Sequence, residues 1–409
     1  MKARPTGRHL LWLLAPATFF DGYDALLLGL ALPLIRAEFG LSLAQAGVMG
    51  SVVFAGSLGG LVLIALADRF GRRLVMTVTI VGYALATGLT AVAVGALIFT
   101  TMQVIARVFL GAEKPLATIM AVETMPRERG GHALAVLSSM LALGQASAGL
   151  GFLLVSAFGT SWRILYAVGV VPLLLISFAR RHLPDTVRPD SAELMTPLRL
   201  SDLRSGPVLG ASGLAFMFAI FPTALTVFAS TMVIEEWRWD LTSLNPLYFV
   251  LWALGLSGFF VAGRIMDTRG RRPAGILFLF GSSLAGFAAF TASTDPGRAL
   301  GLAAVIFFLT GSTTVVSAFT TEPFTAGIRG RIGGVVHLFD IAGAAAAPAL
   351  VGLMAGVVGG VGFALALVGL SYAVGGMLIV TLLPETRTMN AVSSPPGGGS
   401  ERSEPEWDP

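Results

Sequence analysis

Long apolar runs constrain this chain most, because each is long enough to cross a lipid bilayer as a helix. Crossing takes about 20 residues, and backbone groups inside a bilayer must be hydrogen-bonded within the segment, which favours helices. The chain is 55% hydrophobic and 12% charged, whereas soluble domains carry about 25% charged residues. We therefore expect an all-α membrane protein with twelve transmembrane helices, at 10–35, 43–67, 74–94, 96–121, 132–157, 162–179, 207–232, 244–266, 273–292, 299–321, 332–355 and 360–383.

The basic residues predict how the chain is oriented. Most arginines lie in alternate loops, and those loops face the cytoplasm under the positive-inside rule. The basic residues left on the opposite side are Arg36, Arg163, Arg238 and Arg298. Both termini are therefore expected in the cytoplasm. The many arginines, alanines and glycines and the few lysines are typical of a GC-rich bacterium, so we expect a multi-pass protein of the cytoplasmic (inner) membrane of a bacterium.

The chain also repeats itself at an offset of 199 or 200 residues. The repeated motifs are Asp68-Arg69-Phe70-Gly71-Arg72-Arg73 with Asp267-Thr268-Arg269-Gly270-Arg271-Arg272, Glu123 and Arg129-Gly130 with Glu322 and Arg329-Gly330, and Leu183-Pro184-Asp185-Thr186 with Leu383-Pro384-Glu385-Thr386. Such a repeat predicts two pseudo-symmetric six-helix bundles. We expect an N-terminal bundle at 1–179, a cytoplasmic linker at 180–206, a C-terminal bundle at 207–387 and a disordered cytoplasmic tail at 388–409.

The sequence offers no basis for enzyme chemistry. It contains no cysteine, and its four histidines are scattered, so no thiolate site, metal-ligand spacing or catalytic triad is expected. We find no glycine-rich nucleotide loop, and the basic residues follow membrane topology instead of forming a nucleic-acid surface. We expect no enzyme activity, cofactor, metal or nucleic-acid partner.

Four charged residues inside the apolar runs are the candidates for function. Asp21 and Asp24 lie near the middle of the first run and on one side of a helix, while Arg107 and Lys114 lie two turns apart on the fourth. A charge at that depth costs about 3 to more than 10 kcal/mol unless it is paired, hydrated or protonated. We expect Asp21 and Asp24 to couple protons with Arg107 as the modulating cation, and Lys114 to attract a carboxylate. The alternatives are a permanent ion pair joining two helices, and a Lys114 that pairs with Glu113 or extends to the membrane surface.

The repeated loop motifs resemble the cytoplasmic signature of the major facilitator superfamily. Within it, Asp21-Gly22-Tyr23-Asp24 is similar to the first-span motif of the aromatic acid:proton symporters, and Pro384-Glu385-Thr386-Arg387 to the wider metabolite:proton symporter group. The resemblance implies alternating access to a central cavity and uptake, with protons, of a small organic anion, most simply an aromatic or related carboxylate. It implies a small-molecule substrate and protons as partners of a monomer in the bilayer. Uptake of a sugar or another metabolite, efflux by proton antiport, and a sensor that does not transport remain as alternatives.

Further candidate residues fall into three groups. Side chains that could line the cavity are Lys114, Tyr23, Gln145, Phe216, Phe221, Trp252, Thr313, Thr314 and Ser317, although packing alone would explain each one. A second proton site could use His337 with Asp340, or these could form a polar contact at a helix end. Residues that could pair to close the cytoplasmic gate are Asp68, Arg72, Arg73, Glu123, Arg129, Asp267, Arg271, Arg272, Glu322 and Arg329, the alternative being plain membrane topology.

Overall fold

The structure is a computed structural model that describes residues 7–124, 130–170, 203–239, 255, 257–324 and 326–385. Within these residues the regular secondary structure is entirely helical, which confirms the expected fold class. Ten helical segments of the described chain are long and apolar enough to cross a membrane. They match ten of the twelve expected spans. The expected sixth and eighth spans fall partly outside the described residues.

The described helices of the N-terminal half are α1 (Gly7–Phe39), α2 (Leu43–Ala55), α3 (Ser57–Phe70), α4 (Arg72–Ala91), α5 (Ala96–Thr124), α6 (Gly130–Ala157) and α7 (Arg163–Val168). α1 packs along α6, while α3 and α4 pack against α5. The expected second span is two helices, α2 and α3, with a break at Gly56. A Cβ at Gly56 would lie 2.8 Å from the carbonyl oxygen of Val104, so glycine lets α5 come close at the break.

The described helices of the C-terminal half are α10 (Gly206–Thr231), the π-helical turn η2 (Met232–Glu236), α12 (Arg271–Thr291), α13 (Asp295–Thr321), α14 (Ala326–Val358), α15 (Val361–Val368) and α16 (Ser371–Leu382). α10 packs against α14 and α16, and α12 packs against α13. The expected last span is divided into α15 and α16. Hydropathy detects both segments but not the short break between them.

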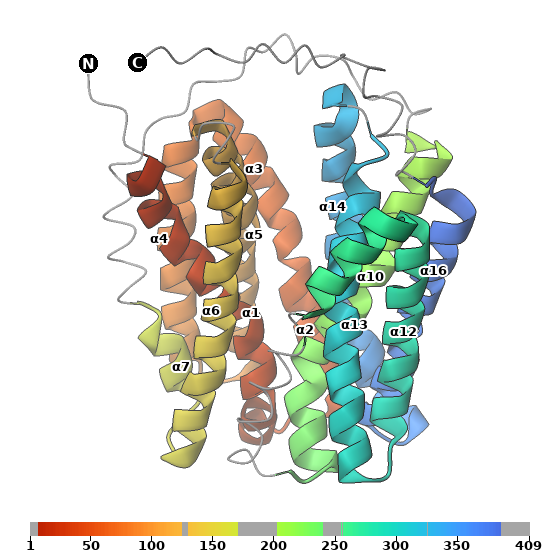
Figure 1. The fold of residues 1–409 in the computed structure, drawn as a ribbon. Helices are drawn as coiled ribbons and strands as arrows, with labels where there is room; N and C mark the ends of the chain where they lie inside the picture. The colour runs from red at the N-terminus through yellow and green to blue at the C-terminus, as the bar shows by residue number, and fades with distance from the viewer. Residues whose placement is uncertain are drawn as a thin grey trace, which may run out of the picture.

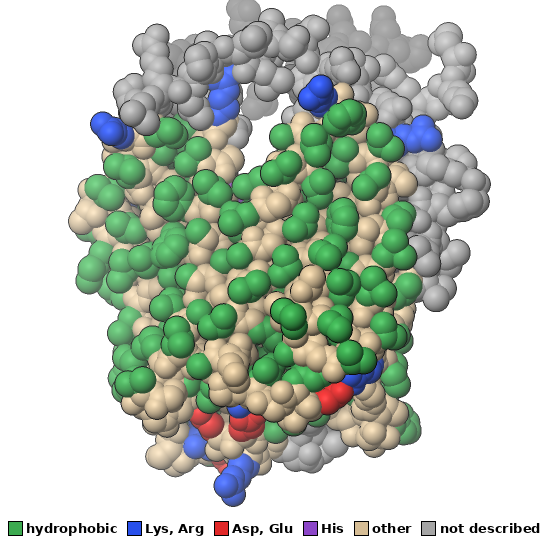
Figure 2. Space-filling view, turned by 180° about the vertical axis from the view of Figure 1, so that it is seen from behind, with side chains coloured by type: hydrophobic (Ala, Val, Ile, Leu, Met, Phe, Trp, Pro, Cys, Tyr) green, Lys and Arg blue, Asp and Glu red, His purple; other side chains and the backbone are tan. Residues whose placement is uncertain are grey.

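The two halves stand side by side and touch at one end (Figure 1). Contacts between them join α2 to α14 and α1 to α10. Gly29 of α1 lies against the backbone of Thr226 in α10, and the Ser51 hydroxyl of α2 accepts the backbone N–H of Ala349 in α14 at 2.8 Å. We call this the closed end; it is where α1 and α10 finish. At the opposite end, Figure 2 shows a notch between the described parts of the two halves.

The side surface is that of a membrane protein. Large apolar side chains are exposed along the helices, as at Leu284 of α12, which is 72% exposed. In Figure 2 hydrophobic side chains cover the flank, while the coloured charged side chains lie at the two ends. In water such a surface would be unfavourable, but in a bilayer lipid tails cover it.

The repeated loop motif makes the same turn in both halves. Its glycine has a positive φ in each copy, 97° at Gly71 and 107° at Gly270. Side chains rarely adopt this conformation, so glycine is the residue that allows it. The turn lets the chain leave one helix and enter the next within one residue, which places Arg72 and Arg271 at equivalent helix starts.

Candidate functional site

Two glycines allow the first-span motif to pack closely against α6. A Cβ on Gly22 would overlap the carbonyl group of Leu141, and a Cβ on Gly144 would overlap that of Phe19. The hydroxyl of the buried Tyr23 also donates a hydrogen bond of 2.8 Å to the carbonyl oxygen of Leu165. Because this face of α1 is fixed against its own half, the orientation of the two aspartates is fixed as well.

Asp24 and Arg107 form a buried ion pair between α1 and α5. Arg107 Nη2 lies 3.5 Å from Asp24 Oδ2, and the residues are only 8% and 2% exposed respectively. The Tyr83 hydroxyl lies near the Asp24 carboxylate as a hydrogen-bonding neighbour, but neither carboxylate oxygen, nor Nε and Nη2 of Arg107, has a partner at full hydrogen-bond geometry among the described residues. A buried charged group without hydrogen bonds is costly, so each member of this pair is incompletely satisfied by the other.

Aromatic rings surround this pair. The guanidinium carbon of Arg107 lies 4.6 Å from the ring centre of Phe54 in α2, which is a cation–π geometry. Tyr23, Tyr83 of α4 and Tyr166 of α7 all interact electrostatically with Asp24. Sequence reasoning missed Phe54, Tyr83 and Tyr166. The chain has five tyrosines but 27 phenylalanines, so rarity is a weak signal for Tyr83 and Tyr166 and gives none for Phe54.

The other intramembrane charges are placed differently. Asp21 is half-buried, one turn before Asp24. Lys114 belongs to α5, but its side chain lies outside the described part of the structure. Its neighbour Glu113 is buried and accepts a 2.7 Å hydrogen bond from Thr79 of α4. Glu113 therefore joins α4 to α5.

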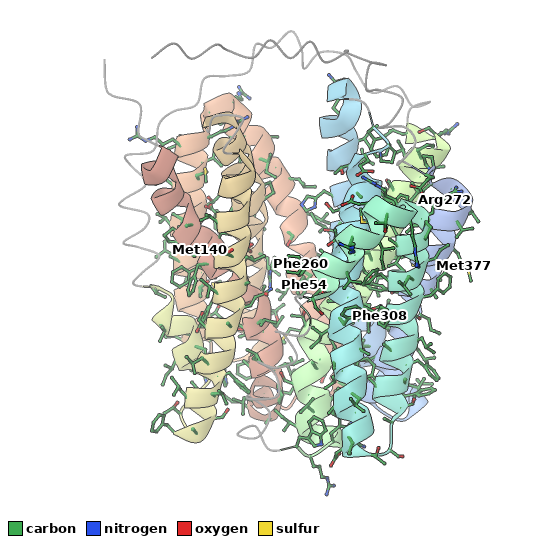
Figure 3. All side chains as sticks on the ribbon, in the orientation of Figure 1. Phe54, Met140, Phe260, Arg272, Phe308 and Met377 are labelled. Carbon is green, nitrogen blue, oxygen red and sulfur yellow. The ribbon has the colours of Figure 1, made fainter. Side chains whose placement is uncertain are left out.

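The candidates for lining the cavity divide into buried and accessible side chains. Tyr23 is held in the core by its hydrogen bond, and the fully buried Phe221 has ring contacts with Phe290 and Tyr372, so packing accounts for both. Phe260 is 79% exposed and appears with Phe54 between the two halves in Figure 3, where sequence reasoning did not expect it. Gln145, Phe216 and Thr314 are half-buried, Thr313 and Ser317 are exposed, and Trp252 lies outside the described residues.

The gate motif of the C-terminal half is a network within that half. Arg271 binds Glu322 at the end of α13 with two hydrogen bonds of 3.1 Å. The backbone N–H groups of Arg271 and Arg272 each donate to Glu385 at 2.9 Å, and the Arg272 guanidinium donates to the carbonyl oxygen of Leu383. These contacts bind the ends of α12, α13 and α16 together. Each of these contacts of the C-terminal gate motif lies within that half.

The N-terminal copy of the gate is described only in part. Arg72 is buried and Arg73 half-buried at the start of α4, while Asp267 in the other copy is exposed. The repeat places Arg72 where Arg271 lies and Glu123 where Glu322 lies. The side chains of Asp68, Glu123 and Arg329, and all of Arg129, lie outside the described residues.

His337 and Asp340 lie one turn apart on α14. His337 Nδ1 is 3.5 Å from Asp340 Oδ2, and both side chains are more than two-fifths exposed. Unlike Asp24, this carboxylate is accessible. The arrangement is therefore compatible with either the proton site or the polar contact that the sequence suggested.

Comparison with known proteins places the chain in a family. Residues 14–322 match the Major Facilitator Superfamily. A putative metabolite transport protein of Haemophilus influenzae is 27% identical over 90% of this chain and 93% of its own. A putative niacin/nicotinamide transporter of Bacillus subtilis is 25% identical, with 85% and 88% covered. A cis,cis-muconate transport protein of Acinetobacter baylyi is 24% identical, with 90% and 92% covered.

The fold is also that of solved transporters. A crystal structure of a D-xylose–proton symporter superposes with a TM-score of 0.78 at 16% sequence identity, covering 93% of this chain and 98% of that one. At that identity the likeness concerns the fold alone. Together, the family match and the helical architecture show that this chain belongs to the major facilitator superfamily of multi-pass membrane transporters.

Proposed function

We propose that this protein is a proton-coupled symporter that takes up a small organic anion, an aromatic or related carboxylate. The observation that carries the proposal is the buried Asp24–Arg107 pair, which lies at 3.5 Å with unfilled hydrogen-bonding atoms on both partners. Intramembrane charges are functional by default. A pair without hydrogen bonds between its members is poorly suited to be a permanent structural link.

The chemistry of the pair suggests how proton and substrate are coupled. When Asp24 takes up a proton, it becomes neutral, and the positive charge of Arg107 is left without its partner. A substrate carboxylate then restores the charge balance, and arginine binds carboxylates with two parallel hydrogen bonds. Release reverses the order, because Asp24 recovers Arg107 once its proton leaves. One proton would thus move with one monovalent anion, and Asp21 would share the proton relay.

The substrate class is supported by the relatives and by the site. Two relatives are named as transporters of niacin or nicotinamide and of cis,cis-muconate, and two of these compounds are carboxylic acids. Arg107, and Lys114 two turns along the same helix, supply cationic groups. Phe54 and Phe260 offer aromatic rings for stacking.

We further infer the orientation and the state of the molecule. With the arginine-rich loops and both termini in the cytoplasm of a bacterial cell, the notch opens to the cytoplasm and the closed end faces outward. The structure then represents an inward-facing state. The two bundles, joined by the linker at 180–206, would then move as two bodies about the central cavity.

The test is uptake into liposomes under an inside-alkaline pH gradient. Labelled benzoate, nicotinate and cis,cis-muconate are compared with nicotinamide, a neutral analogue of nicotinate, and with xylose. We expect gradient-dependent uptake of a carboxylate and none of the neutral compounds. Because one proton balances one monovalent anion, a membrane potential alone should drive no accumulation of benzoate or nicotinate.

Two variants locate the coupling. Asp24→Asn should abolish uphill accumulation while substrate counterflow persists, because counterflow needs no net proton movement. Asp295→Asn makes the same chemical change at an exposed position paired with Arg298, and it should accumulate substrate normally. Full accumulation by Asp24→Asn would refute the proposed coupling. Uptake of xylose alone would refute the substrate class, and accumulation of substrate under the reversed, inside-acidic gradient would indicate proton antiport, the coupling of an exporter.

A further inference from the structure

At the closed end an ion pair between described residues joins the two halves directly. Arg36, near the end of α1, binds Glu235 in the π-helical turn η2 through Nη1, at 2.7 Å from Oε1 and 2.9 Å from Oε2. Its Nε donates to the carbonyl oxygen of Leu41 at 3.3 Å. The Arg36 side chain is 14% exposed and that of Glu235 is 42% exposed. The pair therefore lies at the rim of the closed end, partly screened from water.

Arg36 and Glu235 occupy corresponding positions of the internal repeat. Arg36 and Glu235 are 199 residues apart, which is the offset at which the loop motifs recur. They are therefore equivalent positions of the two halves. Equivalent positions that touch lie on the pseudo-twofold axis between the halves. A strictly symmetric protein would bring two like charges together there, so one cation and one carboxylate at this place require the halves to differ.

Each partner is fixed within its own half by a neighbouring acid. Glu236, next to Glu235, accepts the backbone N–H groups of Val361 and Gly362 at the start of α15. Glu38, two residues after Arg36, is bound by both Trp162 Nε1 and the Arg163 guanidinium. Separating the halves at this end must break the pair on the axis, but it can leave both of these anchors intact.

We propose that Arg36 and Glu235 form an electrostatic latch on the pseudo-twofold axis that holds this end closed. Other contacts between the halves in the described part of this end, such as Gly29 on Thr226 and the Ser51–Ala349 hydrogen bond, are uncharged. The latch therefore gives the closed state a stabilising interaction that depends on salt and charge. Calling this end the outer one rests on the proposed function, but the latch itself does not.

The experiment measures how often the closed end opens. The chain has no cysteine, so spin labels can be attached directly to introduced cysteines. Val94→Cys with Ser293→Cys reports on the loops at the closed end, and both side chains are exposed there. Phe70→Cys with Arg269→Cys reports on the opposite end. Each labelled pair again joins equivalent positions of the repeat, so distances by double electron–electron resonance follow the two halves directly.

Neutralising either partner should favour opening. Glu235→Gln or Arg36→Gln should raise the ratio of open to closed molecules at this end about 1.4- to fivefold, the range expected for a partly exposed pair. The opposite end should become correspondingly more closed. Exchanging the charges, with Arg36→Glu and Glu235→Arg together, should restore the original ratio. Arg298→Gln breaks a salt bridge at the same end but within one half, and it should change nothing.

Salt provides a second readout that needs no substitution in the latch. Raising the ionic strength from about 0.1 M to about 1 M shortens the screening length from about 10 Å to about 3 Å. It should favour opening in the protein with an intact latch and have no such effect in Glu235→Gln. Unchanged distances in Glu235→Gln and in high salt, or an equal response to Arg298→Gln, would overturn the latch. Because no substrate or proton gradient is used, these results are independent of the transport assays.

Discussion

The fit of α1 against α6 makes a quantitative prediction at Gly144. A Cβ built there lies 1.8 Å from the carbonyl oxygen of Phe19 and 2.8 Å from the backbone nitrogen of Tyr23, whereas ordinary contact begins at 3.4 Å. Gly144→Ala must therefore push the two helices apart by about 1.6 Å at the Phe19 carbonyl, because the atoms it meets are backbone and cannot rotate away. Overpacking of this kind costs about 1–3 kcal/mol.

A second glycine of the same helix provides the matched control. Gly149 is in open space with no atom near the position of a Cβ, so Gly149→Ala should gain the helix-forming advantage of alanine, up to about 1 kcal/mol. The two variants should thus differ by about 1–4 kcal/mol in free energy of unfolding. Unfolding in mixed detergent micelles, followed by tryptophan fluorescence, measures this difference. The displacement of α1 also moves Asp24 relative to Arg107, so Gly144→Ala should transport more slowly.

The reasoning would be refuted by two variants of equal stability. A difference below about 0.5 kcal/mol is what surface substitutions produce, and it would mean that α1 and α6 do not pack as closely as described. Normal transport by a clearly destabilised Gly144→Ala would separate the two claims. It would leave the packing intact but show that the geometry of Asp24 and Arg107 tolerates such a shift.

Two further predictions concern stability and use the same unfolding measurement. Thr79→Val removes a hydrogen bond from the buried Glu113 and should cost about 1–3 kcal/mol. The control Thr101→Val removes a hydroxyl at an exposed position and should change the stability by no more than about 0.5 kcal/mol. Equal effects of the two variants would contradict the buried contact. Gly270→Ala puts a side chain at a φ of 107° and should cost about 1–2 kcal/mol. The control Gly206→Ala, where a Cβ meets open space, should cost nothing. A Gly270→Ala variant of unchanged stability would show that the turn relaxes.

Much of the fold could be predicted from the sequence because the bilayer imposes a one-dimensional constraint. Each span must be apolar, helical and of similar length, so hydropathy alone located the ten spans that the structure describes. What hydropathy could not locate is a change of backbone geometry within an apolar run. The break at Gly56 and the π-helical turn at Met232–Glu236 leave composition unchanged, and only packing between helices reveals why they occur.

The candidate site was predictable where a residue is costly in its environment. Asp24 and Arg107 stand out as charges in apolar runs, and the structure brings them together. Tyr83 and Tyr166 do not stand out, since an aromatic residue in a membrane helix serves equally well as core. For the same reason the sequence suggested Phe221 as a residue lining the cavity, whereas in the structure its side chain is fully buried in the core.

The sequence by itself determined the positions of the described spans, the internal repeat and the identity of the intramembrane charges, because each depends on local composition or on comparison of the chain with itself. The tertiary structure alone decided that Arg36 and Glu235 meet. In the sequence Arg36 is merely one of four basic residues expected outside the cytoplasm, and Glu235 is an acid in a loop. Their contact depends on how the two halves are oriented relative to each other, and no local pattern in the sequence encodes that orientation.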